Sequence, residues 1–280
     1  MSAPLLSLQD LSVTFRGDGV QTHAVRNLSL DIAAGETVAL VGESGSGKSV
    51  SALASLGLLP DNAEQGGGVV WKGAEIDRGD AAVMRRLRGN EIGMIFQEPM
   101  TSLNPLHTIE KQIGESLRQH QGMSVEAARA RTLDLLNRVG IPGAETRLAS
   151  YPHELSGGQR QRVMIAMALA NNPDMLIADE PTTALDVTIE AQILDLLADL
   201  KRAEGLSMLF ITHDLGVVRQ IADRVFVMRQ GELVESGDAA SLFAAPREAY
   251  TRDLIAAQPQ GIRPPEPTQG TPLLTAQGIK

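Results

Sequence analysis

A glycine-rich segment between a strand and a helix constrains this chain more than any other feature. Its eight residues are Gly42, Glu43, Ser44, Gly45, Ser46, Gly47, Lys48 and Ser49, in the pattern G-x-x-x-x-G-K-S. The apolar run 37–41 precedes the segment, and an apolar-periodic stretch, 50–59, follows it. Strand, loop and helix in this order are the context that a phosphate-binding loop requires. We refer to residues 42–49 as the phosphate loop.

The residue types of the phosphate loop suit an anion with several oxygens. Its glycines and serines let successive backbone N–H groups point inward, and the helix that begins near Lys48 adds its positive end. Lys48 can reach the outer phosphates of a nucleotide, and the Ser49 hydroxyl can coordinate the Mg²⁺ ion that accompanies them. The segment therefore predicts a site for a nucleoside triphosphate with magnesium, the alternative being a glycine-rich turn that contains Lys-Ser.

Composition narrows the remaining function classes. The 280 residues are 43% apolar, enough for one large domain or two modest ones. A net charge of −9 argues against nucleic acid as the main partner, because phosphate-binding surfaces need basic side chains. The absence of cysteine excludes disulfides and cysteine-ligated metal sites. The longest apolar run, 163–170, is far shorter than the roughly 20 residues that cross a bilayer, and no secretory signal is visible. We expect a soluble chain on the cytoplasmic side.

Polar side chains follow three further apolar strands. These are Gln97 after residues 92–96, Asp179 and Glu180 after residues 175–178, and His213 after residues 207–212. Ligand-contacting side chains are often placed at such strand ends in open α/β sheets. Because side chains alternate along a strand, Asp179 and Glu180 point in opposite directions, so Asp179 is the expected Mg²⁺ ligand and Glu180 the expected general base. His213 is a candidate for contacting a terminal phosphate.

The remaining segments predict an α/β chain with a helical insertion. Residues 5–32 alternate apolar and polar positions, which indicates an antiparallel strand pair; Phe15 on it could stack on a nucleotide base or belong to the core. Loops are expected at 61–62 and 66–68, with a short hairpin arm around 69–73. Helical periodicity dominates 107–172, a β-hairpin is expected over 224–235, and a final helical piece over 242–257.

A second helix end with phosphate-binding character closes the helical insertion. Its residues are Leu155, Ser156, Gly157, Gly158 and Gln159, directly before an apolar helix pattern that runs to Ala170. Small residues, free N–H groups and a positive helix end repeat the physics of the phosphate loop without its lysine.

These motifs together resemble the nucleotide-binding subunit of ATP-binding cassette (ABC) transporters, over nearly all of residues 5–258. The specific mark is Leu155 to Gln159, which matches the family signature. Residues 42–49 look like the Walker A loop, and residues 175–180 look like the Walker B strand with its catalytic glutamate. Gln97 resembles the Q-loop glutamine, and residues 183–186 resemble the D-loop with Asp186. His213 resembles the switch histidine, and Phe15 resembles the aromatic residue that stacks on adenine. The resemblance implies an active ATPase with ATP and Mg²⁺ as ligands, Mg²⁺ being held by Ser49, Gln97 and Asp179.

The same resemblance implies a fold and domain limits. The fold is α/β, a P-loop (RecA-like) ATPase core with an N-terminal antiparallel β subdomain and an inserted helical subdomain. The cassette would span residues 1–258, with the helical subdomain at about 98–172 and a C-terminal extension at about 238–258. Five of residues 259–272 are proline, which is typical of a linker.

A narrower resemblance concerns the cargo. Residues 42–50, 96–105, 180–188 and 245–254 are similar to the ATPases of bacterial oligopeptide, dipeptide and nickel importers, with Ala249 where proline is more usual. Several of those relatives carry a cysteine cluster further on, which this chain lacks. Peptide is therefore the favoured cargo, with nickel or another small solute left open.

The resemblance also implies partners and a mechanism. Two cassettes would pair head to tail, the signature of one (Ser156 to Gln159) covering ATP on the phosphate loop of the other. Two transmembrane permease subunits would dock near Gln97 and the helical insertion, an extracytoplasmic substrate-binding protein would act indirectly, and no nucleic acid is involved. The subunit would be peripheral, on the cytoplasmic face of the bacterial inner membrane. The alternative is an ABC-type ATPase of DNA repair or translation, which usually needs basic surfaces, long insertions or zinc cysteines. A small-molecule kinase, the third possibility, is contradicted by residues 155–159.

A short internal similarity suggests that the polypeptide continues. Residues 4–9 read PLLSLQ and residues 272–277 read PLLTAQ, with four identities. One interpretation is that 273–280 begin a second cassette in the same polypeptide, after a linker at 259–272; chance similarity is the other.

Overall fold

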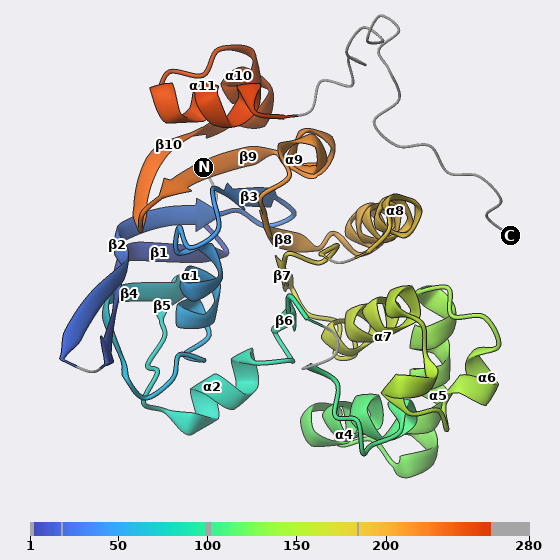
Figure 1. The fold of residues 1–280 in the computed structure, drawn as a ribbon. Coiled ribbons are helices and arrows are strands. Elements are labelled where there is room, and N and C mark those ends of the chain that lie inside the picture. The colour runs from blue at the N-terminus through green and yellow to red at the C-terminus, as the bar shows by residue number, and fades with distance from the viewer. Residues whose placement is uncertain (1–2, 18, 99–101, 184, 259–280) are drawn as a thin grey trace, which may run out of the picture.

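The computed structural model describes residues 3–17, 19–98, 102–183 and 185–258. Figure 1 shows the arrangement of its elements. In chain order these are β1 (Leu6–Gly17), β2 (Val20–Ile32), β3 (Thr37–Val41), α1 (Lys48–Ser55), β4 (Ala63–Trp71), β5 (Ala74–Glu75), α2 (Ala81–Leu87), β6 (Ile92–Ile95), α4 (Ile109–Gln121), α5 (Val125–Arg138), α6 (Ala144–Arg147), the 3₁₀ helix η1 (Pro152–Glu154), α7 (Gly157–Ala168), β7 (Met175–Asp179), α8 (Val187–Glu204), β8 (Ser207–Thr212), α9 (Leu215–Ile221), β9 (Arg224–Arg229), β10 (Glu232–Asp238), α10 (Ala239–Ala244) and α11 (Ala249–Ala256).

Two sheets organise these elements. The larger has the strand order β10-β9-β3-β8-β7-β6, parallel throughout except for the antiparallel edge pair β9 and β10. The smaller, β2-β1-β4-β5, is antiparallel. All parallel strands send their carboxyl ends to one edge of the larger sheet, so the residues that follow them meet there. This arrangement is the predicted α/β fold with an antiparallel N-terminal subdomain.

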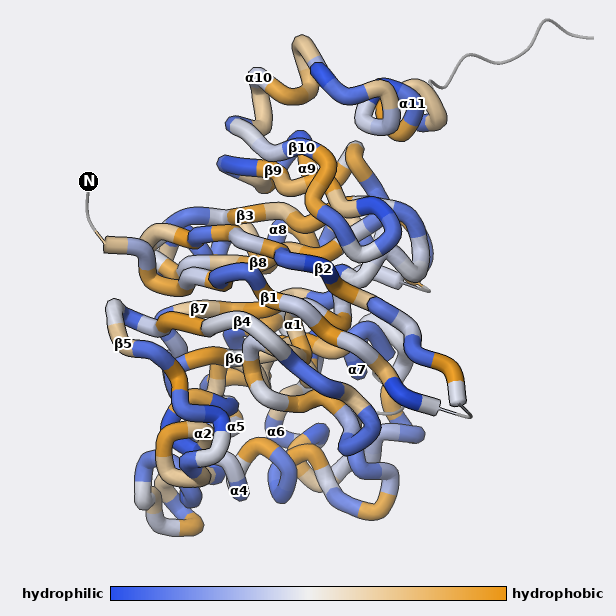
Figure 2. Tube along the Cα trace, turned by 90° about the vertical axis from the view of Figure 1, so that its left-hand side faces the viewer, coloured by the Kyte–Doolittle hydropathy of each residue, from blue (hydrophilic) through white to orange (hydrophobic). Residues whose placement is uncertain are grey.

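The larger sheet is covered on both faces. On β7, Leu176 and Ala178 belong to one apolar core, with α4, α5, α7 and α8, while Met175 and Ile177 belong to another, with α1 and the smaller sheet. Figure 1 shows these two layers on opposite sides of the sheet, and Figure 2 shows apolar residues concentrated along β3, β7 and β8. Burial on both faces explains why the predicted inner strands read as continuous apolar runs.

Helices alone lie between β6 and β7 in the described residues, as the periodicity of 107–172 predicts. Two of them, α4 and α5, start with side-chain caps: the Thr108 and Ser124 hydroxyls accept from the backbone N–H of Lys111 and Ala127. The Arg138 guanidinium is paired with the Glu204 carboxylate, which ties α5 to the end of α8.

Two expectations were wrong in detail. Residues 66–68 are not a loop: they lie in β4 and pair with β1, where a bulge places Asp10 opposite Gly67. A Cβ atom on Gly67 would lie 2.4 Å from the Asp10 carbonyl oxygen, so the glycine allows strands to pass closely rather than ending one. The final helical piece is two short helices, α10 and α11, divided around Pro246.

No helix in the described ranges is both long and apolar enough to span a bilayer. The expected linker at 259–272 and the similarity of 272–277 to 4–9 lie outside the described residues.

Candidate functional site

The phosphate loop runs from the end of β3 into α1, as predicted. Lys48 is buried, and its ammonium donates to the carbonyl oxygens of Gly42 (2.8 Å) and Glu43 (2.9 Å). Burial lowers the pKa of Lys48, and the carboxylates of Glu180 and Asp179 oppose that shift. A positive charge is thus held in the middle of a loop rich in backbone N–H groups.

Two glycines of the loop are required by close backbone approach. Gly42 has φ +150°, and a Cβ there would lie 2.1 Å from the Met228 carbonyl oxygen. Gly47 has φ +101°, and a Cβ there would lie 2.4 Å from the Ala24 carbonyl oxygen. The loop is therefore enclosed by β9 on one side and β2 on the other, and both positions need glycine for conformation and for space.

Ser49 and Asp179 meet across the site. The Ser49 hydroxyl donates to Asp179 Oδ1 at 2.8 Å, and the carboxylate is 5% exposed. Burial raises the pKa of Asp179 and the neighbouring Glu180 adds to this, whereas the Ser49 hydrogen bond and Lys48 act the other way. A hydroxyl and a carboxylate are the hard oxygen ligands that Mg²⁺ prefers, so these residues fit the ion.

Glu180 is the centre of a second set of contacts. Its Oε2 accepts from the Gln97 amide (3.2 Å) and from the Thr183 hydroxyl (2.8 Å), and its Oε1 lies 3.4 Å from His213 Nδ1. Its φ is +44°, uncommon for a residue with a side chain, and its N–H donates to the Ile211 carbonyl (2.9 Å). Strained backbone of this kind clusters at functional sites, where the surroundings enforce it.

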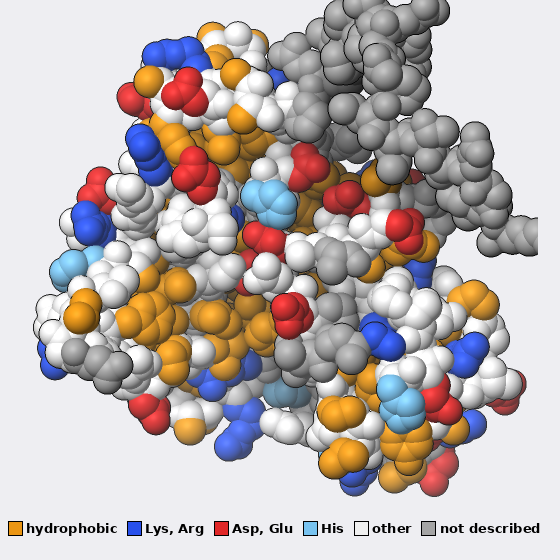
Figure 3. All heavy atoms as spheres, viewed as in Figure 1, with side chains coloured by type: hydrophobic (Ala, Val, Ile, Leu, Met, Phe, Trp, Pro, Cys, Tyr) orange, Lys and Arg blue, Asp and Glu red, His pale blue; other side chains and the backbone are white. Residues whose placement is uncertain are grey.

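The predicted residues at the strand ends are thus brought together at one edge. A surface hollow there is lined by Ser49, Leu53, Phe96, Gln97, Glu98, Ser102 and Asp179. Figure 3 shows acidic side chains gathered near the middle of this face of the molecule. Since phosphates are also negative, Lys48 and a divalent cation are the charges that would offset this repulsion.

The predicted signature residues form a helix end elsewhere. The Ser156 hydroxyl accepts from the Gln159 N–H (3.3 Å) and the Gln159 amide oxygen accepts from the Ser156 N–H (3.0 Å), a capping box that starts α7. Gly158 packs closely on Ile189 of α8. The apolar core that contains α7 and the apolar core that contains α1 lie on opposite faces of the larger sheet. Within the described chain, the structure therefore places the signature and the phosphate loop on different layers.

Two further predicted residues have clear local surroundings. Phe15 is half-buried near the tip of the β1–β2 hairpin, packed against the core of the smaller sheet. Asp186 caps α8, its carboxylate accepting from the Ile189 N–H at 2.9 Å. The roles predicted for both in nucleotide binding stay predictions.

Sequence reasoning missed two contacts of the site: it placed Thr183 in the D-loop without a contact to Glu180, and it gave Tyr250 no role there. Thr183 binds Glu180, and its place three residues later in a turn was the available signal. The Tyr250 hydroxyl accepts a hydrogen bond from the Glu43 N–H of the phosphate loop at 3.3 Å. No local pattern indicates that contact, because 207 positions separate the two residues.

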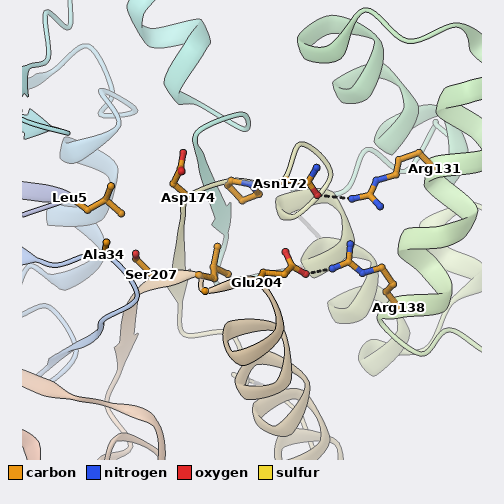
Figure 4. A pocket seen from close by; sticks show the side chains of 11 residues that line it. Leu5, Ala34, Arg131, Arg138, Asn172, Asp174, Glu204 and Ser207 are labelled. Atoms are coloured by element: carbon orange, nitrogen blue, oxygen red, sulfur yellow. Dashed lines mark hydrogen bonds and ion pairs between the residues drawn. The ribbon is translucent and has the colours of Figure 1, made fainter.

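Another hollow lies at the opposite, amino-terminal edge of the parallel strands. It is lined by Leu5, Ala34, Arg131, Arg138, Asn172, Pro173, Asp174, Glu204, Gly205, Leu206 and Ser207. Figure 4 shows Arg131 bound to Asn172 and Arg138 bound to Glu204 across it. Both arginines of α5 are thus paired with residues that line the hollow. The hollow lies where the helices between β6 and β7 meet the rest of the fold, and it is not the candidate site.

The fold and the site together define an α/β nucleotide-binding protein with a P-loop. The family described as ABC transporter matches residues 25–183, more than half of the chain. This chain belongs to that family.

Curated relatives agree with this assignment. The chain is 59% identical over 273 residues to the "Peptidoglycan transport ATP-binding protein YejF" of Agrobacterium fabrum, covering 97% of this chain and 50% of that protein. It is 53% identical over 267 residues to the "Glutathione import ATP-binding protein GsiA" of Escherichia coli, covering 91% of this chain and 42% of that protein. The chain therefore spans about half the length of the curated relatives it matches.

Solved structures show the same fold. The chain matches the ATP-binding cassette MJ0796, in a dimeric post-hydrolysis state bound to ADP and Pi, with TM-score 0.74 and 32% identity, covering 84% of this chain and 98% of that one. It matches cbiO1 of Clostridium perfringens, part of the ABC transporter complex cbiONQ, with TM-score 0.72 and 29% identity, covering 87% and 92%.

Proposed function

We propose that this chain is an ATP-binding and ATP-hydrolysing cassette that powers an ABC importer. The observation that carries the proposal is the meeting of Ser49 with Asp179, and of Gln97, Thr183 and His213 with Glu180, at one edge of the larger sheet. A buried lysine in the adjacent phosphate loop supplies the positive charge that phosphates need.

Each residue has a role in this proposal. The phosphate loop and Lys48 bind the phosphates of ATP, and Phe15 stacks on the base. Ser49, Asp179 and the Gln97 amide oxygen hold Mg²⁺, which when bound neutralises charge on the phosphates. Glu180 orients the attacking water and accepts its proton, and His213 contacts the terminal phosphate. The hydrogen bonds that the Glu180 carboxylate accepts from Gln97 and Thr183 fix it in place before substrate arrives.

A complete site requires a second cassette. The start of α7 is made of small residues, but the apolar core to which α7 belongs lies across the sheet from the phosphate loop of the same chain. We propose that the signature of a partner cassette covers the ATP instead, with Asp186 near that contact. The partner is a second copy, a different cassette chain or, as the similarity of 272–277 to 4–9 suggests, another cassette of the same, longer polypeptide.

The transport partners follow from the same proposal. Two permease subunits dock near Gln97 and the helical segment, a substrate-binding protein delivers cargo, and the cassette sits on the cytoplasmic face of the inner membrane. Relatives named for peptidoglycan transport and glutathione import support a peptide-type cargo. The domain limits proposed are those expected from the sequence: a cassette at 1–258, with a helical subdomain at about 98–172 and a C-terminal extension at about 238–258.

Replacing the proposed general base tests this function. Glu180→Gln keeps the shape of the side chain and one accepting oxygen, but its amide cannot take up a proton from the attacking water. We expect ATP binding to persist, ATP-dependent pairing to increase, and turnover to fall by at least about 100-fold. The matched control is Glu145→Gln, an exposed glutamate on α6, which should hydrolyse ATP like the unmodified chain. Unchanged hydrolysis by Glu180→Gln would reject the assignment of the base.

A further inference from the structure

The C-terminal helix α11 lies beside the loops that form the candidate site. Figures 1 and 2 both show α10 and α11 against the β9–β10 pair and near α9. Phe243, Tyr250, Leu254 and Ile255 pack on a core shared by β3, β9 and α9. The Arg219 guanidinium of α9 stacks on the Phe243 ring at 4.6 Å. The two helices are therefore anchored to the strand that leads into the phosphate loop.

The first turn of α11 contacts the phosphate loop directly. Its Tyr250 hydroxyl accepts the hydrogen bond from the Glu43 N–H (3.3 Å), while Lys48 donates to the Glu43 carbonyl (2.9 Å). One residue of the loop is thus held at both of its backbone polar groups. The Tyr250 ring is itself fixed by the Arg229 guanidinium, 4.8 Å from its centroid.

The other end of α11 contacts the segment that follows His213. With the Gln258 amide oriented so that its oxygen faces α9, that oxygen accepts from the Gly216 N–H (2.6 Å) and the Leu215 N–H (3.2 Å). The Gly216 N–H is shared with the Asp214 carboxylate (2.6 Å). Gln258 therefore helps to satisfy the free donors at the start of α9, two residues after His213.

A third contact sets the position of α11 itself. Glu235 of β10 accepts from the N–H groups of Arg247 (2.9 Å) and Glu248 (3.1 Å), which immediately precede the helix. Charge-assisted bonds to a carboxylate are stronger than neutral ones, so the start of α11 is firmly placed relative to the larger sheet.

We propose that Tyr250 and Gln258 are positioning residues, and that α11 is a brace that fixes the phosphate loop relative to the His213 segment. This inference rests on the proposed function for its consequence: Tyr250 sets nucleotide affinity through the loop, and Gln258 sets the contact of His213 with the terminal phosphate. Disturbing α11 would then alter nucleotide binding without touching a residue that contacts the nucleotide.

Hydrogen–deuterium exchange in the absence of nucleotide tests the brace itself. Tyr250→Phe removes only the acceptor, and exchange over 42–49 should rise between about 2-fold and about 10-fold, the range for loss of one net hydrogen bond, with 214–219 unchanged. Gln258→Ala should raise exchange over 214–219 and leave exchange over 42–49 unchanged. Ser241→Ala is the control: it removes a hydroxyl of α10 that donates to the Asp238 carboxylate, and both segments should exchange as in the unmodified chain.

Equilibrium binding separates positioning from general destabilisation. Tyr250→Phe should weaken Mg-ADP and Mg-AMP-PNP by the same factor, about 2-fold to 10-fold, because the loop holds the phosphates common to both. Gln258→Ala should weaken AMP-PNP alone, because only that ligand carries a third phosphate, at the γ position, for His213. A merely structural role would lower the unfolding midpoint without this selectivity. Unchanged exchange in both segments overturns the brace, whereas failure of the unmodified chain to bind either nucleotide overturns the proposed function and leaves the exchange result standing.

Discussion

Ser49 and Asp179, 130 positions apart, are joined by a 2.8 Å hydrogen bond at the carboxyl edge of the larger sheet. The bond connects the start of α1 with the end of β7, the two elements that deliver the proposed magnesium ligands. It places a carboxylate in a buried position beside Glu180, a second negative charge. An arrangement that suits a divalent cation is therefore costly for the folded chain when the ion is absent.

This cost predicts that Asp179→Asn stabilises the chain in EDTA while removing a proposed magnesium ligand. The amide oxygen still accepts from Ser49, but the buried charge is gone, so unfolding should cost about 1 kcal/mol more at pH 8. Because burial raises the native pKa of Asp179, the native state binds more protons than the unfolded state between the two pKa values, and stability of the unmodified chain falls as pH rises there.

The pH profile of this difference is the sharper measurement. The advantage of Asp179→Asn should be small below the unfolded-state pKa of about 3.9, where both states carry a protonated carboxyl, and should reach a plateau above the raised native pKa. Urea unfolding at several pH values measures it. Asp195→Asn, on the exposed face of α8, controls for a general effect of charge. A difference that shrinks as pH rises would contradict the burial argument.

Ser49→Ala is predicted to weaken the effect of magnesium on ATP affinity. Removing the hydroxyl deletes one proposed oxygen ligand and the Asp179 hydrogen bond. We expect the gain in ATP affinity on adding Mg²⁺ to shrink by about 10-fold, the size of one charge-assisted hydrogen bond. Binding of a fluorescent ATP analogue titrated with and without Mg²⁺ measures this. Ser49→Thr keeps the hydroxyl and should behave like the unmodified chain; an equal loss in both variants would mean that the site responds to bulk rather than to the oxygen.

Local features of the site could be predicted from the sequence because each depends on nearby residues. The phosphate loop, the helix start at Ser156 to Gln159, and the apolar strands before Gln97, Glu180 and His213 follow from residue type and spacing. The meeting of the phosphate loop with the residues after β6, β7 and β8 follows from parallel pairing, which sends these strand ends to one edge.

What the sequence did not predict depends on distant parts of the chain. Gly67 reads as a loop residue until Asp10 is placed opposite it at a bulge, and the helical tail reads as one helix although Pro246 divides it. The contact of Tyr250 with Glu43 has no local signal, since an acceptor for one loop N–H can come from any element packed nearby.

Glycine substitutions should separate backbone strain from steric clash. Gly47→Ala combines φ +101° with a Cβ 2.4 Å from the Ala24 carbonyl, and should destabilise by at least about 2 kcal/mol. Gly45→Ala has φ +79° with open space around it, so only strain applies, about 1 kcal/mol. Gly17→Ala, with neither feature, should lie within about 0.5 kcal/mol of the unmodified chain. Thermal unfolding ranks the three, and equal costs for Gly47 and Gly45 would show that β2 yields to the added methyl.

The pairing of Arg138 with Glu204 is predicted to couple α5 of the helical segment to the end of α8. The side chains are 30% and 21% exposed, so solvent screens the pair only in part. A double-mutant cycle of Arg138→Ala and Glu204→Ala, read by urea unfolding, should give a coupling free energy of about 0.5 to 1 kcal/mol that declines in 1 M salt. The exposed pair Arg202–Asp199, at 78% and 66%, is the matched comparison and should give a smaller coupling. Because Arg138 lies on α5 and Glu204 ends α8, breaking their pair should also raise hydrogen exchange in α5 while leaving β7 protected. Equal coupling in the two pairs would place the attachment of the helical segment in its apolar contacts with α8 instead.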